Sequence, residues 1–340
     1  MKKRFFIANM IIAMASVQAA CSACTNNNET EEMTTNATMV QDYSATQETD
    51  GIRFTLNGVE WKMIMVEKGT FMMGSDNSGQ SNEKPAHQVT LTQDYLMGQT
   101  EVTEALWNLA MGRSGGRTEY PIASVTRDQC QTFVDNLNAL MHEAGMPAEW
   151  NFKMPTEAQW EFAARGGNKS KGYKYCGSDN LDEVAWTSAN HSSSAANAVA
   201  KKKPNELGLY DMSGNVYEWV FDYPNDYPST PQTDPCYATR KNQYIKRGGS
   251  IYYSDSYRFT PHYRYYYGGT DWTIGFRLCL MGPTTANPTT GMETASVNEK
   301  SSYSKGVYSL RGTRLLARAA DIQQLPKGVY IVDGTKRIVK

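Results

Sequence analysis

The most informative part of this chain is Arg247-Gly248-Gly249-Ser250-Ile251-Tyr252-Tyr253-Ser254-Asp255-Ser256-Tyr257-Arg258. It contains no cysteine, and its tyrosine-rich character continues to Tyr267 and includes Arg264. Aromatic and guanidinium groups on loops suit the recognition of peptides or sugars, because they offer stacking and hydrogen bonds at low entropic cost. Tyrosine at this density also suits the core of a strand-poor fold, with its hydroxyl groups at the surface.

Other motifs accompany this stretch in a definite order. They are GTFMMGS at residues 69–75, EVT at 101–103, MPTEAQWEFAARGG at 154–167, GLYDMSGNVYEW at 208–219 and GFR at 275–277. Together with the RGGS of residues 247–250, they resemble the motifs of the formylglycine-generating (sulfatase-modifying factor) family. The resemblance covers residues 51–280 and implies an α+β, C-type-lectin-like fold with little regular secondary structure. No linker-like break interrupts this range, so we expect a single domain there.

Local patterns within this domain predict a few regular elements. Strands are expected at residues 59–66, 69–75 and 87–91. Helices are expected at residues 104–111, from about 126 or 127 to 140, and at 155–165, with Thr103 as N-cap of the first. In the second helix the apolar residues share one face at the helical period, and that face should be core: Cys130, Phe133, Val134, Leu137 and Leu140.

The catalytic chemistry of the family depends on thiols that this chain lacks at the matching positions. The resemblance implies a copper-binding cysteine pair after the RGGS motif, and those positions hold Tyr253 and Arg258 here. Copper is therefore not expected, because the family's copper site is a pair of thiolates. The remaining cysteines of the domain do not have the required spacing. Cys176 could pair with Cys236 in an oxidising exterior, or Cys130 with Cys279, and a helical Cys130 is more often an inert buried thiol.

Calcium is the cofactor that the resemblance does imply. The carboxylates of Asp211 and Glu218 flank a tight turn, and the carbonyl groups of Gly214 and Val216 can point to the same place. Hard oxygen ligands at alternating positions of a turn suit calcium. The alternative is that the carboxylates of both residues accept hydrogen bonds from the backbone around the turn.

The resemblance also places a groove beside the RGGS stretch. We expect the groove to be lined by residues from three motifs: Tyr217, Trp219, Ser250, Tyr253, Arg258 and His262. The chain has few histidines, with no metal-ligand spacing and no Ser-His-acid set, so nucleophilic hydrolysis has no support. A net charge of −1 and the absence of a basic arm argue against nucleic acid as a partner.

The beginning of the chain predicts export. Residues 1–20 join a basic start to a short apolar run that ends in small residues, as in a bacterial signal peptide. Cys21 follows and is the candidate for lipid modification, with Cys24 a weaker candidate and simple cleavage near Ala20 the alternative. Residues 21–50 are polar and acidic, which predicts a disordered tether.

The end of the chain predicts a second small unit. Residues 281–305 are rich in Thr, Ser and Asn and should form a linker. Residues 306–340 contain two similar β-forming repeats, with Asp333-Gly334 a hairpin signal. This segment resembles the sorting domains that type IX secretion recognises in Bacteroidetes, although it could simply pack on the main domain. Both ends indicate an extracytoplasmic protein, either an outer-membrane lipoprotein or a secreted or cell-surface protein.

Two classes of function remain. The first is a non-catalytic protein whose groove holds a peptide, a glycan or a cell-envelope protein, or which serves as an envelope scaffold. The second is an oxidoreductase of the same superfamily that works without the cysteine pair. A working formylglycine generator would need thiols that this sequence does not provide at the matching positions.

Overall fold

The structure is a computed structural model, and it describes residues 42–191, 195–269 and 272–282, together with the backbone of strands between residues 307 and 339. The chain divides into two compact units, residues 1–284 and 285–340, which are described separately. Among the described residues no helix is both long enough and apolar enough to cross a membrane.

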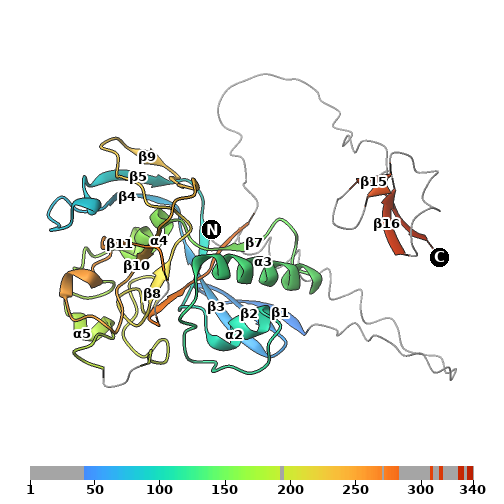
Figure 1. Ribbon diagram of the computed structural model, residues 1–340, viewed down its shortest axis with the longest axis horizontal. Helices are drawn as coiled ribbons and strands as arrows, with labels where there is room; N and C mark the ends of the chain where they lie inside the picture. The colour runs from blue at the N-terminus through green and yellow to red at the C-terminus, as the bar shows by residue number, and fades with distance from the viewer. Residues whose placement is uncertain are drawn as a thin grey trace. The chain divides into compact units, whose positions relative to one another are not determined.

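A six-stranded antiparallel sheet runs through the first unit (Figure 1). In spatial order its strands are β1 (Tyr43–Gln47), β2 (Gly51–Leu56), β3 (Val59–Val66), β6 (Tyr95–Gly98), β13 (Cys279–Met281) and β7 (Asn151–Lys153). Asn57 and Gly58 join β2 to β3 with positive φ angles of 49° and 78°, as a two-residue hairpin loop requires.

Strand β1 corrects the domain boundary expected at residue 51. The acidic segment before Gly51 is not a disordered tether throughout, because Tyr43–Gln47 pairs along its length with β2. Acidic side chains of this segment also form ion pairs, since Lys62 Nζ lies 2.7 Å from the Glu48 carboxylate and 2.8 Å from the Asp50 carboxylate. The domain therefore begins at about residue 42, and the earlier part of the expected tether lies outside the described residues.

Strand β3 separates two hydrophobic cores. Met63 and Met65 pack in one core, whereas Ile64 and Val66 pack in the other. Successive side chains of a strand point to opposite faces, so a continuous apolar run is what a sheet covered on both sides requires. The first core contains residues of α2 (Glu104–Ala110) and α3 (Arg127–Glu143), and the second contains residues of α4 (Glu157–Ala164).

The expected helices are present, and each begins at a threonine cap. Thr103, Thr126 and Thr156 accept hydrogen bonds from the backbone of the first turn, and the last two form complete capping boxes. The apolar face predicted for the second helix is buried, with Leu140 half-buried and Met141 buried further along. Trp107 of α2 stacks on Phe133 of α3 at 5.3 Å between ring centroids.

Shorter elements complete the first unit. A second sheet has the order β11 (Arg264–Tyr267), β10 (Tyr244–Arg247), β8 (Tyr217–Trp219) and β12 (Ile274–Phe276), with β8 and β12 parallel. A third sheet contains β4 (Gly69–Met73), β5 (His87–Leu91) and β9 (Gln232–Thr233), which lie together in Figure 1. Helix α5 (Leu181–Val184) and three 3-10 turns are also present: Ser81–Glu83, Gly167–Lys169 and Ser256–Phe259.

The second unit is a four-stranded sheet with the order β15 (Arg314–Leu316), β14 (Val307–Tyr308), β16 (Gly328–Val332) and β17 (Thr335–Val339). All its pairings are antiparallel. Val332 pairs with Thr335, which leaves a two-residue connection between β16 and β17, as a hairpin at Asp333-Gly334 requires. The expected linker from residue 283 onward lies outside the described residues.

Buried ion pairs join β10 and β11 to α4. Arg247 Nη2 lies 2.6 Å from Glu161 Oε2, and Arg264 Nη2 lies 2.6 Å from Glu157 Oε2. The two arginine residues are 0% and 1% exposed. Arg264 also donates to the carbonyl groups of Asn82 and Asn225, at 3.1 and 2.9 Å. One side chain thus connects three segments that are far apart in sequence.

Replacing Arg264 with methionine should lower the free energy of unfolding by about 3–5 kcal/mol, because buried Glu157 loses two of its three arginine hydrogen bonds and the carbonyl groups of Asn82 and Asn225 lose an arginine donor. Urea unfolding followed by tryptophan fluorescence measures this change. The matched control is Arg240→Met, whose side chain is 73% exposed and pairs only with Asp128, and which should cost less than about 1 kcal/mol. Equal losses in the two variants would contradict the role given to the buried pair.

Candidate functional site

Tyr253 and Arg258, the positions matched to the family's cysteines, contact each other. The guanidinium carbon of Arg258 lies 4.2 Å from the centroid of the Tyr253 ring. Arg258 also donates to the Tyr263 hydroxyl at 2.8 Å and to the Asp255 carboxylate at 3.0 Å. Burial raises the pKa of Tyr263 to about 12, so its hydroxyl remains protonated at neutral pH. A cation held among phenol rings occupies the place where the family resemblance implies a thiol pair.

Exposed aromatic side chains surround this pair. We call Tyr252, Tyr253, Tyr257, Tyr265 and Trp272 the aromatic surface. Tyr252 is 61% exposed and Trp272 is 41% exposed, and their rings lie 6.1 Å apart. Tyr252 also contacts Tyr253 edge to face at 5.0 Å. Exposed rings that are in contact with one another offer a preformed surface on which a ligand can stack.

Lys246 lies beneath the aromatic surface. It is 3% exposed, and its ammonium group lies 4.1 Å from the centroid of the Tyr217 ring and 5.4 Å from that of Tyr265. Tyr217 in turn packs edge to face against Tyr253 at 5.9 Å. The buried cation therefore connects the rings of β8 and β11 to the loop after the RGGS motif.

Three of the predicted groove residues are too buried to line a surface. Trp219 is 0% exposed, and its indole nitrogen donates to the Val125 carbonyl group at 2.8 Å. Tyr217 is 1% exposed, and Ser250 is 0% exposed, with no hydrogen-bond partner for its hydroxyl group among the described residues. Of the three, Tyr217 packs against Tyr253 of the aromatic surface, whereas Trp219 packs against Tyr244 and Tyr267. Their membership of the motifs gave no information about their exposure.

His262 contacts the buried ion pairs and not the aromatic surface. Its Nε2 atom lies 3.6 Å from Glu83 Oε2, which would be an ion pair if the ring were protonated. Burial, however, lowers the pKa of His262 to about 4 and raises the pKa of Glu83. At neutral pH the His262 imidazole is therefore uncharged, and its contact with Glu83 is not an ion pair. Nothing in this geometry gives His262 a role in binding at Tyr253.

The predicted calcium residues lie in a buried acidic cluster. Glu218 is 0% exposed and is already held by Arg277, at 2.7 and 2.6 Å, and by the indole of Trp160 at 2.7 Å. Asp211 accepts a hydrogen bond from the Ala200 backbone through Oδ2, whereas its buried Oδ1 has no partner among the described residues. Burial raises the pKa of Asp211 to about 6.

Sequence reasoning missed Glu101 as a member of this cluster. Glu101 is 2% exposed, and it accepts only long hydrogen bonds of 3.4 Å from Asn215 and the Val216 backbone. Burial and the nearby carboxylates of Asp211 and Glu218 raise its pKa. Its EVT motif and the GFR motif of Arg277 were both visible in the sequence, but their proximity was not.

The acidic cluster meets some of the requirements of a cation-binding site. Three acids, Glu101, Asp211 and Glu218, share one guanidinium group, which leaves an excess of negative charge when all are ionised. In the described part of the chain, however, no three His, Cys, Asp or Glu side chains converge as a metal site would require. A cation here would therefore depend on the free oxygen of Asp211 and on backbone carbonyl groups.

The cysteines of the described residues are all free thiols. Cys130, Cys176 and Cys279 are buried, and Cys236 is exposed. The pairings considered for Cys176 with Cys236 and for Cys130 with Cys279 are therefore not formed. Burial raises the pKa values of Cys176 and Cys279 to about 12, so both are protonated and weakly nucleophilic at neutral pH.

Known proteins share this architecture. The chain is 31% identical over 215 residues to the chaperone protein LppX of Paenibacillus barcinonensis, covering 50% of this chain and 74% of that protein. It is 31% identical over 160 residues to the formylglycine-generating enzyme of Streptomyces coelicolor, covering 42% of this chain but only 45% of the enzyme. The match thus spans less than half of that enzyme's length.

A solved structure agrees with the sequence relatives. Treponema denticola variable protein 1 superimposes with a TM-score of 0.59 and 26% identity, covering 68% of this chain and 99% of that protein. The expected α+β fold of the formylglycine-generating type is thereby confirmed. Residues 56–281 match the sulfatase-modifying factor enzyme 1-like domain, and the chain therefore belongs to this family.

Proposed function

We propose that this protein is an exported, non-catalytic member of its family that holds a peptide or a glycan on the aromatic surface, as a binding or scaffold protein of the cell envelope. The observation that supports this most is the contact of Arg258 with Tyr253 at the positions matched to the family's thiols. An arginine held by Asp255 and Tyr263 supplies charge and hydrogen bonds but no redox chemistry. The chaperone named among the relatives is compatible with such a role.

The aromatic surface has the chemistry that such binding needs. Tyr252 and Trp272 offer large, rigid faces, which lose little conformational entropy on binding. Tyr257, 42% exposed, packs edge to face on Tyr263, whose hydroxyl group is already bonded to Arg258. The rings are thus supported from behind, and a ligand would not have to order them.

Replacing Tyr252 with alanine should weaken binding to the best-binding members of a peptide array and a glycan array by about tenfold, because it removes an exposed ring at the centre of the contacts. Arg258→Ala should weaken binding at least as much. Both variants are compared with the wild-type full chain by titrating the array hits. The matched control is Tyr237→Ala, which removes a tyrosine outside the aromatic surface and should leave binding unchanged.

Two results would contradict the proposal. One is unchanged binding in both the Tyr252 and Arg258 variants. The other is turnover: the full chain, incubated with a Cys-x-Pro-x-Arg peptide, copper and oxygen, would convert the peptide thiol to an aldehyde with a measurable loss of mass. Turnover would instead favour the oxidoreductase alternative.

We also propose that calcium binds at the acidic cluster, held by Asp211 and Glu218 and by the carbonyl groups of Gly214 and Val216. The partnerless Oδ1 atom of Asp211 supports this assignment, because a buried carboxylate oxygen without a donor is costly unless a cation compensates it. Calcium would neutralise the excess charge and fix the turn. Glu218 would have to contribute while it remains bonded to Arg277.

Calcium at a hundredfold excess over its dissociation constant should stabilise the wild-type chain by about 2.7 kcal/mol, because it binds only the native state. Differential scanning calorimetry with calcium and with chelator measures the corresponding shift in melting temperature. Asp211→Asn should abolish the shift, whereas the surface control Asp179→Asn should retain it. A wild-type melting temperature that is the same with calcium and with chelator would overturn the assignment.

The cellular location is part of the same proposal. Cys21 would carry a lipid that anchors the chain on the outside of the cell, and this residue lies outside the described residues.

Radiolabelled palmitate should be incorporated into the wild-type protein and lost in Cys21→Ala. Cys24→Ala is the matched control and should keep the label. Labelling that survives the Cys21 change would contradict the anchor, and complete absence of label in the wild type would favour simple cleavage and release.

A further inference from the structure

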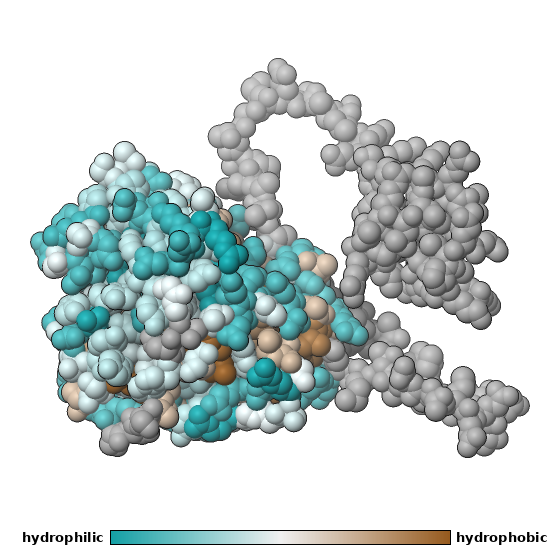
Figure 2. Space-filling model, viewed as in Figure 1, coloured by the Kyte–Doolittle hydropathy of each residue, from teal (hydrophilic) through white to brown (hydrophobic). Residues whose placement is uncertain are grey.

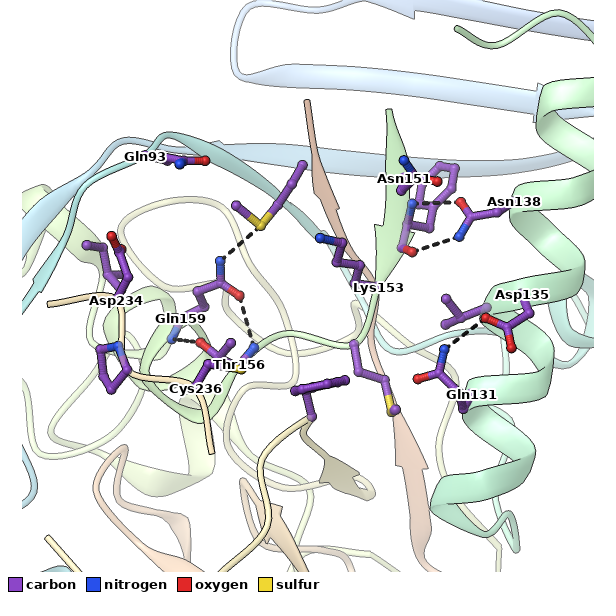
Figure 3. A pocket seen from close by; sticks show the side chains of 17 residues that line it. Gln93, Gln131, Asp135, Asn138, Asn151, Lys153, Thr156, Gln159, Asp234 and Cys236 are labelled. Atoms are coloured by element: carbon purple, nitrogen blue, oxygen red, sulfur yellow. Dashed lines mark hydrogen bonds between the residues drawn. The ribbon is translucent and has the colours of Figure 1, made fainter. Parts of the chain in front are cut away.

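A cavity lies between α3, β7, α4 and residues 234–236 (Figure 3). Its volume is about 570 Å³, within the range of pockets that bind small molecules. None of its lining residues belongs to the aromatic surface or to the acidic cluster. Neither the family chemistry nor the proposed binding surface accounts for this cavity.

The walls of the cavity include firmly packed apolar side chains. Phe152 is 0% exposed and Met154 is 2% exposed. On its other side Phe152 packs against the rings of Phe54 and Trp61, at 5.5 and 6.0 Å. Val134 of α3, also buried, faces the same cavity. These side chains form the backing of the cavity, and the half-buried side chains of Phe221 and Met281 give it accessible apolar surface.

Most polar groups in the cavity already have partners. Asn138 makes two hydrogen bonds with the Phe152 backbone, at 2.9 and 2.8 Å. The Gln159 side chain accepts from the Thr156 backbone at 2.9 Å. Asp135 accepts from Gln131, and Asp234 accepts from the Thr92 backbone, both at 2.9 Å. The polar lining is therefore held in a fixed arrangement before any ligand arrives.

Lys153 differs from the other polar groups. It ends β7, it is exposed, and it lies between the α3 side and the α4 side of the cavity in Figure 3. Within the described ranges it forms no ion pair and no hydrogen bond through its ammonium group. A cation without a partner beside an apolar wall is suited to a ligand that has one acidic end and one apolar end.

We propose that this cavity binds a small amphipathic carboxylic acid, with its carboxylate at Lys153 Nζ and its hydrocarbon part against the half-buried side chains of Phe221 and Met281. Asp135 and Asp234 disfavour a ligand with a second negative charge, because both carboxylates line the same cavity. A monoacid with a medium-length chain meets both conditions. The site is independent of the aromatic surface, so either proposal can fail alone.

Cys236 provides a way to observe the site directly. It lines the cavity, and it is the exposed one among the four cysteines of the described residues. A ligand that fills the cavity should shield its thiol. Burial raises the pKa of Cys236, so alkylation is best measured at mildly alkaline pH.

Sodium decanoate is the probe, used with the full chain below the concentration at which decanoate aggregates. We expect it to raise the melting temperature and to slow N-ethylmaleimide modification of Cys236 at least fivefold, as measured by mass spectrometry of the peptide that carries this residue. Lys153→Met should weaken decanoate binding about tenfold or more, because the charge-assisted contact is lost. The matched control Lys169→Met removes an exposed lysine outside the cavity and should bind normally.

Decanol separates the roles of charge and apolar surface. It should bind the wild type about as weakly as decanoate binds the Lys153 variant. The proposal is overturned if decanoate neither stabilises the chain nor protects Cys236. It is equally overturned if decanol binds as well as decanoate, or if the Lys153 variant keeps full affinity, because the carboxylate would then not be recognised.

Discussion

Buried pairing between arginine and glutamate is the interaction on which this fold depends. Arg247 and Arg264 bind the acids of α4, and Arg277 binds Glu218. Most of the chain around them is loop, so backbone ladders alone cannot specify its path. The same guanidinium groups also donate to loop carbonyl groups, which would otherwise be buried without donors. Taking these charges out of water is costly, and the geometry offsets that cost only when every partner is in place.

The aromatic surface is held in place by these pairs. Arg247 is the first residue of the RGGS motif and Arg264 follows the loop after it, and both side chains bind Glu157. The segment from residue 248 to residue 263 is therefore fixed at its two ends by one carboxylate. Its aromatic side chains are presented on a rigid base, although the segment itself contains only a short 3-10 turn, Ser256–Phe259.

Local signals in the sequence were sufficient for α2, α3 and α4, whereas the fold followed from the resemblance of its ordered motifs to a known family. Thr103, Thr126 and Thr156 mark where α2, α3 and α4 begin, because capping depends on a few neighbouring residues. The β1 strand was missed because an acidic, polar segment looks disordered until Lys62 is placed beside it. Trp219 and Ser250 were assigned to a groove from their motifs, yet both are fully buried. Exposure and ion pairing depend on residues far away in the sequence, such as Arg277 for Glu218.

Fixing a loop at both ends has an evolutionary consequence. Side chains such as Tyr252 and Tyr257 point to solvent and contribute little to the buried pairs that define the scaffold. Exchanging them would alter the chemistry that the surface presents while the free energy of folding changes little. A scaffold of this kind can acquire new ligands by point mutation alone, without waiting for compensating changes in its core.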